Sequence, residues 1–328
     1  MAKCTRLGEP DGLAAGRLET TFGMETMAAG KADIGAIDPP FEIMHPAAPG
    51  SPAVFDSPHS GRVYPADFIA SSRLDRLTLR RSEDCYIDEL FAWSCDLGAP
   101  LLMAHFPRAY LDVNREPCEL DPAMFMDRLP AHANTASPRV AGGLGTIPRI
   151  VCEHEEIYRW PLRYREAEAR IERLYRPYHA ALAGLMDAAA ASAGWALLID
   201  CHSMPSSAAP QVHRPPGGGR ADIVLGDRYA ASCDPAITGL LDELFAARGL
   251  RVARNKPYAG GYITQTYGQP RFARHAVQVE VNRGLYINER HLSKSAGFER
   301  LRQVLAEVFG AFLARLPQTA AIPAIAAE

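Results

Sequence analysis

Residues 195–203 read WALLIDCHS, an apolar run that passes directly into the polar sequence Asp200-Cys201-His202-Ser203. A short apolar run without alternation is typical of a strand that is buried on both faces of a mainly parallel sheet. In sheets of this kind, ligands bind beyond the carboxyl ends of the strands. The stretch therefore predicts a central strand that leads to a functional edge beside His202.

Further apolar runs on either side of this stretch predict other strands of the same sheet, at 53–56, 100–104, 222–226 and 276–281. Apolar residues at helical spacing predict helices over 85–93, 161–191 and 297–316. Pro177 lies inside the second helical pattern, so we expect a kink or a break there. Strands that alternate with helices predict an α/β fold with an open, helix-covered and mainly parallel sheet.

The two ends of the chain lack these patterns. Residues 1–48 show no sustained periodicity, and we expect a poorly ordered N-terminal segment there. By the same reasoning, 317–328 is expected to be a flexible tail. The remaining 49–316 is long enough to bury a large core, and we expect it to form a single domain.

Composition restricts the class of protein. The chain has 328 residues, of which 48% are hydrophobic, and a formal net charge of −3, with no basic stripe that would indicate a nucleic-acid partner. No apolar run reaches the length of about 20 residues that a membrane helix needs. The seven cysteines form no CxxC pair, and the N-terminus lacks the apolar core of a signal peptide. We therefore expect a cytoplasmic protein that binds neither nucleic acid nor membrane, and the sequence leaves its oligomeric state open.

Two histidines are candidate metal ligands because each follows a predicted buried strand and lies next to serine. They are His59, in the sequence DSPHSG, and His202. A catalytic zinc ion takes three ligands from His, Asp, Glu or Cys and keeps one position open for water. Either histidine alone is more often a hydrogen-bonded core or surface residue. Together, at two strand ends, they favour a metal site.

The third ligand is less well determined. Asp84 is a candidate, but an aspartate directly before the helix predicted at 85–93 is the ordinary N-cap of such a helix. Glu83 and Asp88 remain alternatives as ligands.

Glu280, in the apolar strand sequence VQVEV, is a candidate general base. A buried carboxylate needs a charged partner or a raised pKa, and either property is common in catalytic sites. As alternatives, strand alternation turns Glu280 towards solvent, or Arg283 pairs with it in a structural role.

Three further segments supply candidate substrate contacts. Asn114 and Arg115 follow a polar turn, and a guanidinium group binds carboxylates through two parallel hydrogen bonds. Tyr262 and Thr264 lie in the glycine-rich sequence KPYAGGYIT at 256–264, as in a substrate loop. A surface salt bridge is the alternative for Arg115, and an ordinary turn is the alternative for the glycine-rich segment.

The segments together resemble the N-formylglutamate amidohydrolase family over roughly Phe55 to Glu289. The matching sequences are FDSPHSG (55–61), EDCYIDELF (83–91), RAYLDVNR (108–115), YRPYHAAL (175–182), IDCHSM (199–204), GGYIT (260–264) and HAVQVEVNRGLYINE (275–289). The resemblance implies a fold similar to that of the zinc carboxypeptidases, in which helices cover both faces of a mixed, largely parallel sheet and the metal lies at its carboxyl edge.

The resemblance also implies a zinc-dependent amidohydrolase, with zinc bound by His59, Asp84 and His202. Glu280 would be the general base, and Arg108 is our candidate to stabilise the oxyanion. The expected reaction is hydrolysis of an N-formyl or N-acyl amino acid, N-formyl-L-glutamate above all, in histidine degradation. The alternatives are another N-acyl amino acid, a small peptide, or a ligand-binding relative without catalysis.

One departure affects the ligand set that the resemblance implies. Carboxypeptidases take two metal ligands from an HxxE motif, but the third position after His59 is Arg62 in this chain. The third ligand must therefore come from another segment.

Overall fold

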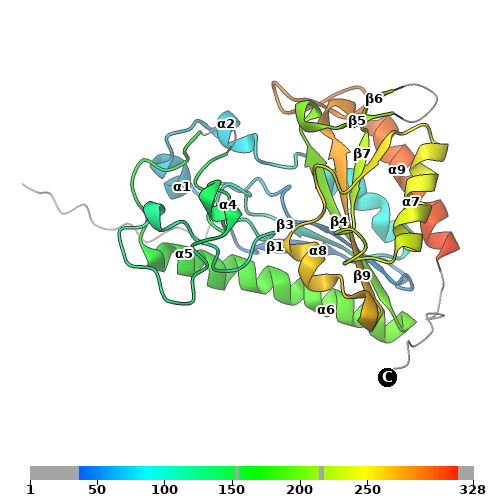
Figure 1. Cartoon of the computed structure of the whole chain (residues 1–328), viewed down its shortest axis with the longest axis horizontal. Helices are drawn as coiled ribbons and strands as arrows, with labels where there is room; N and C mark the ends of the chain where they lie inside the picture. The colour runs from blue at the N-terminus through cyan, green and yellow to red at the C-terminus, as the bar shows by residue number, and fades with distance from the viewer. Residues whose placement is uncertain (1–36, 152–154, 214–217, 317–328) are drawn as a thin grey trace, which may run out of the picture. The chain divides into compact units, whose positions relative to one another are not determined.

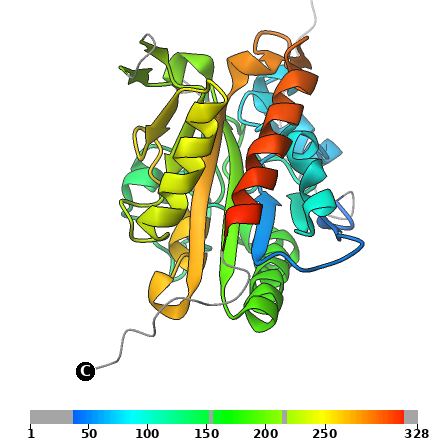
Figure 2. The ribbon, with the colours of Figure 1, turned by 90° about the vertical axis from the view of Figure 1, so that its right-hand side faces the viewer.

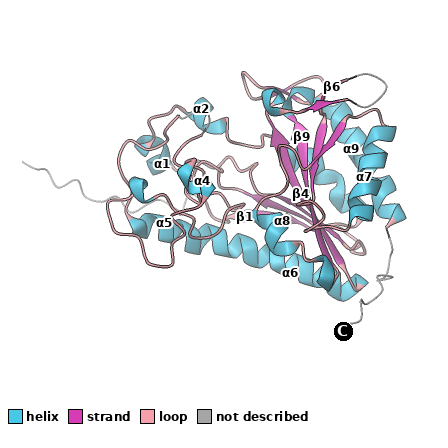
Figure 3. Cartoon of the chain, in the orientation of Figure 1, coloured by secondary structure: helices cyan, strands magenta, loops and turns pink. Residues whose placement is uncertain are grey.

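The computed structural model describes residues 37–151, 155–213 and 218–316. Their main feature is a seven-stranded sheet with the order β1-β3-β2-β4-β9-β7-β8 (Figure 3). The strands are β1 (Phe41–Met44), β2 (Ala53–Ser57), β3 (Leu101–Ala104), β4 (Ala196–Met204), β7 (Ile223–Gly226), β8 (Val252–Arg254) and β9 (Arg274–Asn282). Strands β3, β2, β4 and β9 are parallel, whereas β1 and β7 each pair antiparallel to a neighbour. The predicted mixed, largely parallel sheet is confirmed.

Helices cover both faces of the sheet, as Figures 1 and 2 show. On one face, α3 (Ile87–Phe91), α7 (Pro235–Ala247) and α9 (Phe298–Arg315) pack on apolar side chains that include Phe55. On the other face, α6 (Arg176–Ala193) packs on side chains that include Val54. Because successive strand residues point to opposite faces, a strand that is covered on both faces must be apolar throughout. This explains why the strands are continuous apolar runs in the sequence.

The predicted helices are present, with one change inside a helical segment and one at the end of a helix. The segment 161–191 contains α5 (Tyr164–Arg170), one π-helical turn η4 (Ile171–Tyr175) and α6. Pro177 lies in the first turn of α6. Because proline has no N–H and its ring collides with the preceding turn, the helix widens just before it; the expected break is absent, and the run continues through a π-helical turn. The helix expected at 85–93 is shorter and continues as a 3₁₀ helix, η2 (Ala92–Leu97).

The expected N-terminal boundary at residue 48 is wrong. Residues 1–36 and 317–328 lie outside the described residues, but Phe41–Met44 form the edge strand β1 against β3. Strand β1 was not predicted because four residues between prolines are too few to show a periodicity, and an edge strand tolerates proline at its ends. Strand β8 was not predicted either, because its three residues are too few to show a pattern.

The remaining elements are short. Some lie in a long, loop-rich excursion between β2 and α6, which Figure 1 shows to the left of the sheet, and the others follow β4. They are α1 (Ala66–Ser71), α2 (Arg76–Arg80), η3 (Pro122–Met124) and α4 (Pro138–Ala141) in this excursion, and η5 (Ser206–Ala208), β5 (Gln211–Val212), β6 (Gly219–Arg220), α8 (Tyr262–Tyr267), η6 (Pro270–Phe272), η7 (Arg283–Leu285), β10 (Ile287–Asn288) and β11 (Ser293–Lys294) after β4. Long loops inside a compact domain commonly carry function. Among the described helices, none combines the length and the apolar character that crossing a bilayer requires.

Candidate metal centre and substrate pocket

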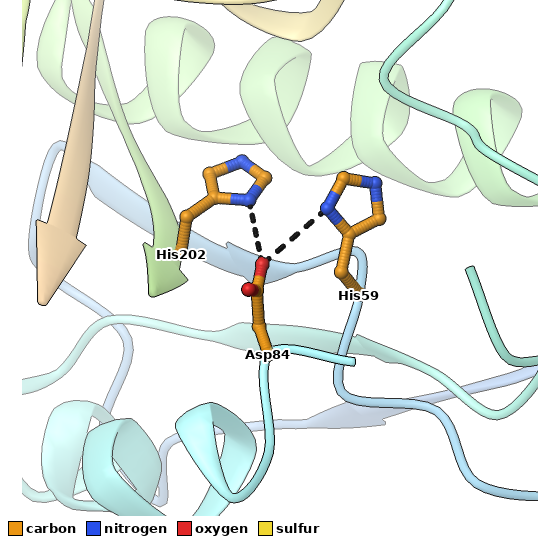
Figure 4. Close-up of side chains that lie close together, drawn as sticks. All are labelled: His59, Asp84 and His202. Atoms are coloured by element: carbon orange, nitrogen blue, oxygen red, sulfur yellow. Dashed lines mark hydrogen bonds and ion pairs between the residues drawn. The ribbon is translucent and has the colours of Figure 1, made fainter. Parts of the chain in front are cut away.

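Three side chains that the sequence singled out meet at the carboxyl edge of the sheet (Figure 4). Oδ2 of Asp84 lies 3.0 Å from Nδ1 of His202 and 3.4 Å from Nδ1 of His59. The three side chains each offer a ligand atom, and these atoms all lie within 4.8 Å of one another. All three residues are buried. The arrangement is that of a three-ligand metal site.

The backbone explains why residues so distant in the sequence meet here. Strands β2 and β4 are parallel neighbours in which Asp56 pairs with Asp200, so His59 and His202 emerge at the same edge. The backbone N–H of Asp84 donates to the carbonyl oxygen of His59 at 3.0 Å. This bond attaches the segment before α3 to the loop after β2, and the Asp84 side chain is thereby directed at both histidines.

The three acidic candidates for the third ligand differ in their contacts. Glu83 accepts a hydrogen bond from the Tyr64 hydroxyl at 2.6 Å, and Asp88 pairs with Arg62. Neither belongs to the cluster around the histidines. The N-cap position of α3 is Tyr86 and no side chain caps this helix, so the capping role considered for Asp84 is wrong. The side chain of Asp84 is left for the histidines.

Each histidine has a carboxylate close to its second ring nitrogen. Nε2 of His59 lies 2.8 Å from Oδ1 of Asp112, and Nε2 of His202 lies 2.7 Å from Oδ1 of Asp200. Carboxylates in these positions fix the ring orientation and keep the proton on Nε2, so that Nδ1 presents its lone pair. Nδ1 of His59 is buried and has no hydrogen-bond partner among the described residues. A metal ion would satisfy this nitrogen, and the donor set fits one.

The charges in the cluster support the same interpretation. Burial opposes ionisation of Asp84, but the nearby imidazoles of His202 and His59 hold its pKa well below the ordinary value. Burial likewise disfavours a charged His202, but the carboxylates of Asp200 and Asp84 raise the pKa of its imidazole well above the ordinary value. The cluster therefore stabilises positive charge at its centre, which protons provide when no metal is bound.

Glu280 faces this cluster from β9. It pairs with His202 in the parallel register of β4 and β9, and Nε2 of Gln278 donates to its Oε1 at 2.7 Å. Burial, opposed by the nearby charge of His202, raises the pKa of Glu280 to about 7. Arg283 does not pair with it. Instead, Nη2 of Arg283 donates to Oδ1 of Asp84 at 3.1 Å, so the structural alternative considered for Glu280 is wrong.

A pocket of about 410 Å³ opens in front of the three candidate ligands and Glu280. Its wall contains five arginines: Arg81, Arg108, Arg115, Arg139 and Arg283. Nε of Arg108 donates to Oδ2 of Asp112 at 3.0 Å, and within the described chain the two Nη groups of Arg108 make no hydrogen bond. They are available to a ligand. A pocket wall so rich in guanidinium groups suits an anionic molecule.

Arg115 and Asn114 line the pocket but are partly engaged by the protein. Nε and Nη1 of Arg115 donate to the carbonyl oxygens of Leu144 and Asn114, each at 2.7 Å. Burial lowers the pKa of Arg115 to about 10. Oδ1 of Asn114 accepts the backbone N–H of Ile263 at 2.8 Å, which ties the glycine-rich segment to the pocket wall.

The structure places Tyr262 and Thr264 away from the pocket. Thr264 is fully buried and donates to the carbonyl oxygen of Gly261, and the ring of Tyr262 packs against His179 with 5.8 Å between centroids. The residues of this segment that line the pocket are 257–261. A Cβ on Gly261 would lie 2.2 Å from Oδ1 of Asn114, so the glycines are needed for close approach.

Sequence reasoning did not single out Asp112, Asp200, Tyr258 and Arg139, all of which lie in or directly behind this site. Asp200 carries a recognisable signal, because a carboxylate two residues before a candidate metal-binding histidine is well placed to orient a ring at the same edge. Asp112 precedes the Asn114-Arg115 pair in the same polar turn. Arg139 and Tyr258 carry no such signal.

Comparisons with known proteins agree with this geometry. A family model described as N-formylglutamate amidohydrolase matches residues 51–287. An N-formylglutamate deformylase of Pseudomonas aeruginosa is 30% identical over 270 residues, which cover 80% of this chain and 93% of that protein. An N-formylglutamate deformylase of Pseudomonas putida is 29% identical over 241 residues, which cover 73% of this chain and 82% of that protein.

Two solved structures share the fold. The crystal structure of an N-formylglutamate amidohydrolase from Ralstonia eutropha JMP134 matches with a TM-score of 0.77 and 34% identity, over 84% of this chain and 99% of that chain. A gene product from Agrobacterium tumefaciens matches with a TM-score of 0.52 and 18% identity, over 84% of this chain and 94% of that chain. The second likeness concerns the fold alone.

Proposed function

This chain belongs to the N-formylglutamate amidohydrolase family, and we propose that it hydrolyses N-formyl-L-glutamate to formate and glutamate with a zinc ion held by His59, Asp84 and His202. The observation that carries the proposal is the buried Nδ1 of His59, which lacks a partner among the described residues and faces Asp84 and His202. Buried polar atoms are normally hydrogen-bonded, and this nitrogen lies beside two further ligand atoms, so a metal ion accounts for it.

A bound zinc ion would supply a Lewis acid that polarises the amide carbonyl and makes water more acidic. Glu280 provides the proton acceptor. Its buried carboxylate lies in register with His202, and its pKa of about 7 suits a group that takes a proton from the attacking water and returns it to the leaving nitrogen. Gln278 holds Oε1 of Glu280, which leaves the other carboxylate oxygen for the water.

Two arginines have distinct roles in this proposal. Arg108 directs its Nη groups into the pocket and stabilises the negative charge that develops on the carbonyl oxygen. Arg115 binds the α-carboxylate of the amino acid with the N–H groups that the protein leaves unused. Asp112 accepts from Arg108 and lies 3.5 Å from Nη2 of Arg115, while its other oxygen holds His59. One carboxylate thus connects the metal ligand with both substrate-binding cations.

The proposal is tested by metal analysis combined with a formate-release assay. We expect the purified protein to contain close to one zinc per chain, to release formate from N-formyl-L-glutamate, to lose this activity after chelation and to regain it with added zinc. N-acetyl-L-glutamate serves as the comparison substrate. Formate release that continues unchanged in fully metal-free protein would contradict the metal mechanism, and faster turnover of the acetyl compound would contradict the assignment of the acyl group.

A further inference from the structure

One part of the pocket wall carries positive charge that the protein itself does not balance. Arg108 and Arg283 are paired with Asp112 and Asp84 at the metal centre. Among the residues that the structure describes, Arg139, which follows the N-cap Ser137 of α4, has only a long ion pair of 3.9 Å with Glu119. Its guanidinium therefore remains available on the pocket side.

A second cation approaches the same wall from the turn after β7. Arg228 has no acidic partner in the part of the chain that the structure describes. It lies against Gly260, a residue of the pocket wall, because a Cβ on Gly260 would be 2.9 Å from Cγ of Arg228. Gly260 also has a φ of +121°, which only glycine adopts readily. The glycine thus permits the arginine side chain to pack directly against the pocket wall.

The turn that presents Arg228 is strained. Three successive residues, Arg228, Tyr229 and Ala230, have positive φ angles of 52°, 57° and 69°. A positive φ is unfavourable for an L-residue, so such a run persists only where other contacts impose it. Here Asp227 accepts the backbone N–H of Ala230 at 3.1 Å, and Asn255 accepts those of Asp227 and Tyr229 at 3.0 and 3.3 Å. Strain maintained in this way is typical of a functional position.

The two cations belong to one electrostatic group with Arg115. After burial, the repulsion from Arg139 contributes to lowering the pKa of Arg115 and of Arg228. Arg139 therefore repels both Arg115 and Arg228, and a bound anion reduces that repulsion. A single α-carboxylate on Arg115 leaves the other two without a partner.

We propose that Arg139 and Arg228 bind a second carboxylate, carried by the side chain of the substrate, and that they are the specificity-determining residues for an acidic N-acyl amino acid. This inference rests on the proposed function, because it assigns the part of the substrate that the hydrolytic reaction does not touch. The guanidinium groups would distinguish a carboxylate from the isosteric amide by charge, since an amide leaves the cations unneutralised and cannot accept from both with equal strength.

The test compares N-formyl-L-glutamate with N-formyl-L-glutamine, which differ by one charge at nearly constant shape. We expect wild-type kcat/KM to favour the glutamate compound, and the ratio of the two kcat/KM values to fall about tenfold or more in Arg139→Gln and in Arg228→Gln. Arg139→Lys keeps the charge and should retain part of the preference. Arg165→Gln, an exposed arginine of α5 outside the pocket, is the matched control and should keep the wild-type ratio.

The possible outcomes separate this inference from the proposed function. If the zinc-loaded wild type hydrolyses neither compound, the proposed function itself fails. If it hydrolyses both and the ratio in Arg139→Gln and Arg228→Gln equals that of the wild type, the two arginines do not select the side chain and the inference is overturned. Inhibition by the products offers an independent measurement: L-glutamate should inhibit the wild type more strongly than L-glutamine, and this difference should shrink in both variants.

Discussion

Glu280 is the residue on which the catalytic proposal depends most. Its carboxylate is buried, its pKa is raised to about 7, and its hydrogen bond comes from Gln278 rather than from a cation. Glu280→Gln keeps the shape but cannot accept a proton. We expect kcat to fall by roughly 10²–10⁴ while zinc content and melting temperature stay near wild type. Single-turnover rates and a melting curve provide the two readouts, and a destabilised but fully active variant would end this mechanism.

Asp112 is predicted to control metal affinity without touching the metal. It holds Nε2 of His59 at 2.8 Å and binds Arg108 with its other oxygen. In Asp112→Asn, the lost charge weakens the orientation of His59, so we expect zinc affinity to fall about 10–100-fold. Asp121→Asn is the control, because Asp121 pairs with Arg149 in the same excursion but away from the ligands. Competition with a zinc indicator measures the zinc affinity of both variants. An affinity of Asp112→Asn equal to that of the wild type would contradict a role of Asp112 in metal binding.

At this scale the sequence predicted the site unevenly. His59, His202 and Glu280 were predictable because each lies at or in an apolar strand, where a polar side chain is costly without a function. The choice of Asp84 over Glu83 and Asp88 was not predictable. Glu83 and Asp88 are bound by Tyr64 and Arg62, and these are tertiary contacts that a local sequence pattern does not show. Tyr262 and Thr264 lie next to the glycines that do line the pocket, but the chain turns away into α8 at that point.

Among the elements, α6 connects the core to the pocket. His179 of α6 hydrogen-bonds the carbonyl oxygen of Val113 through Nε2 at 2.9 Å, and Tyr175 donates to the carbonyl oxygen of Arg115 at 2.7 Å. The segment that carries Asn114 and Arg115 is therefore held by hydrogen bonds from α6 and from the π-helical turn that precedes it. The π-helical turn before Pro177 contains Tyr175, so the irregularity that the proline imposes lies in the part of the helix that contacts this segment.

His179 makes the stability of this contact dependent on pH. Burial lowers the pKa of its imidazole to about 4, whereas an unfolded histidine titrates near 6.5. Between these values the unfolded chain binds a proton that the folded chain does not, so the contribution of His179 is fully present above pH 6.5 and is lost as pH falls towards 4. We expect the urea midpoint to drop between pH 7.5 and pH 5, and to drop less in His179→Gln. His132→Gln, at an exposed position, should behave as wild type. An unchanged pH dependence in His179→Gln would contradict the assignment.

The elements that the sequence predicted well are those with enough residues to show a period. Strands β2, β4 and β9 are buried along their length and helix α9 buries one face, so that pattern and structure coincide. Strands β1 and β8 have four and three residues and owe their existence to the neighbours they pair with. Pairing partners are a property of the tertiary fold, and no local pattern of that length reveals them.

For the molecule as a whole, the candidate metal centre joins three segments that are far apart in the sequence. His59 follows β2, Asp84 precedes α3, and His202 lies near the end of β4. A metal ion at this point would cross-link the centre of the sheet to the loop-rich excursion that forms much of the pocket wall. The site is not assembled in the unfolded chain, so the ion binds the folded chain. Its binding free energy therefore adds to the stability of the folded state.

Zinc removal should therefore lower the melting temperature of the entire domain. At a free zinc concentration 100 times Kd, the expected stabilisation is about 2.7 kcal/mol, which is large against the marginal stability of a folded domain. The metal-free protein should nevertheless stay folded, because a protonated His202 pairs with Asp84 and Asp200 and replaces the lost positive charge.

In His59→Ala and His202→Ala, bound zinc and the zinc-dependent rise in melting temperature should disappear together, while far-ultraviolet circular dichroism stays that of the wild type. Calorimetric scans with and without chelator measure the shift. Equal zinc content in the variants and the wild type would show that the ion binds elsewhere, and unfolding of the wild type on chelation would show that the metal is structural rather than confined to the site.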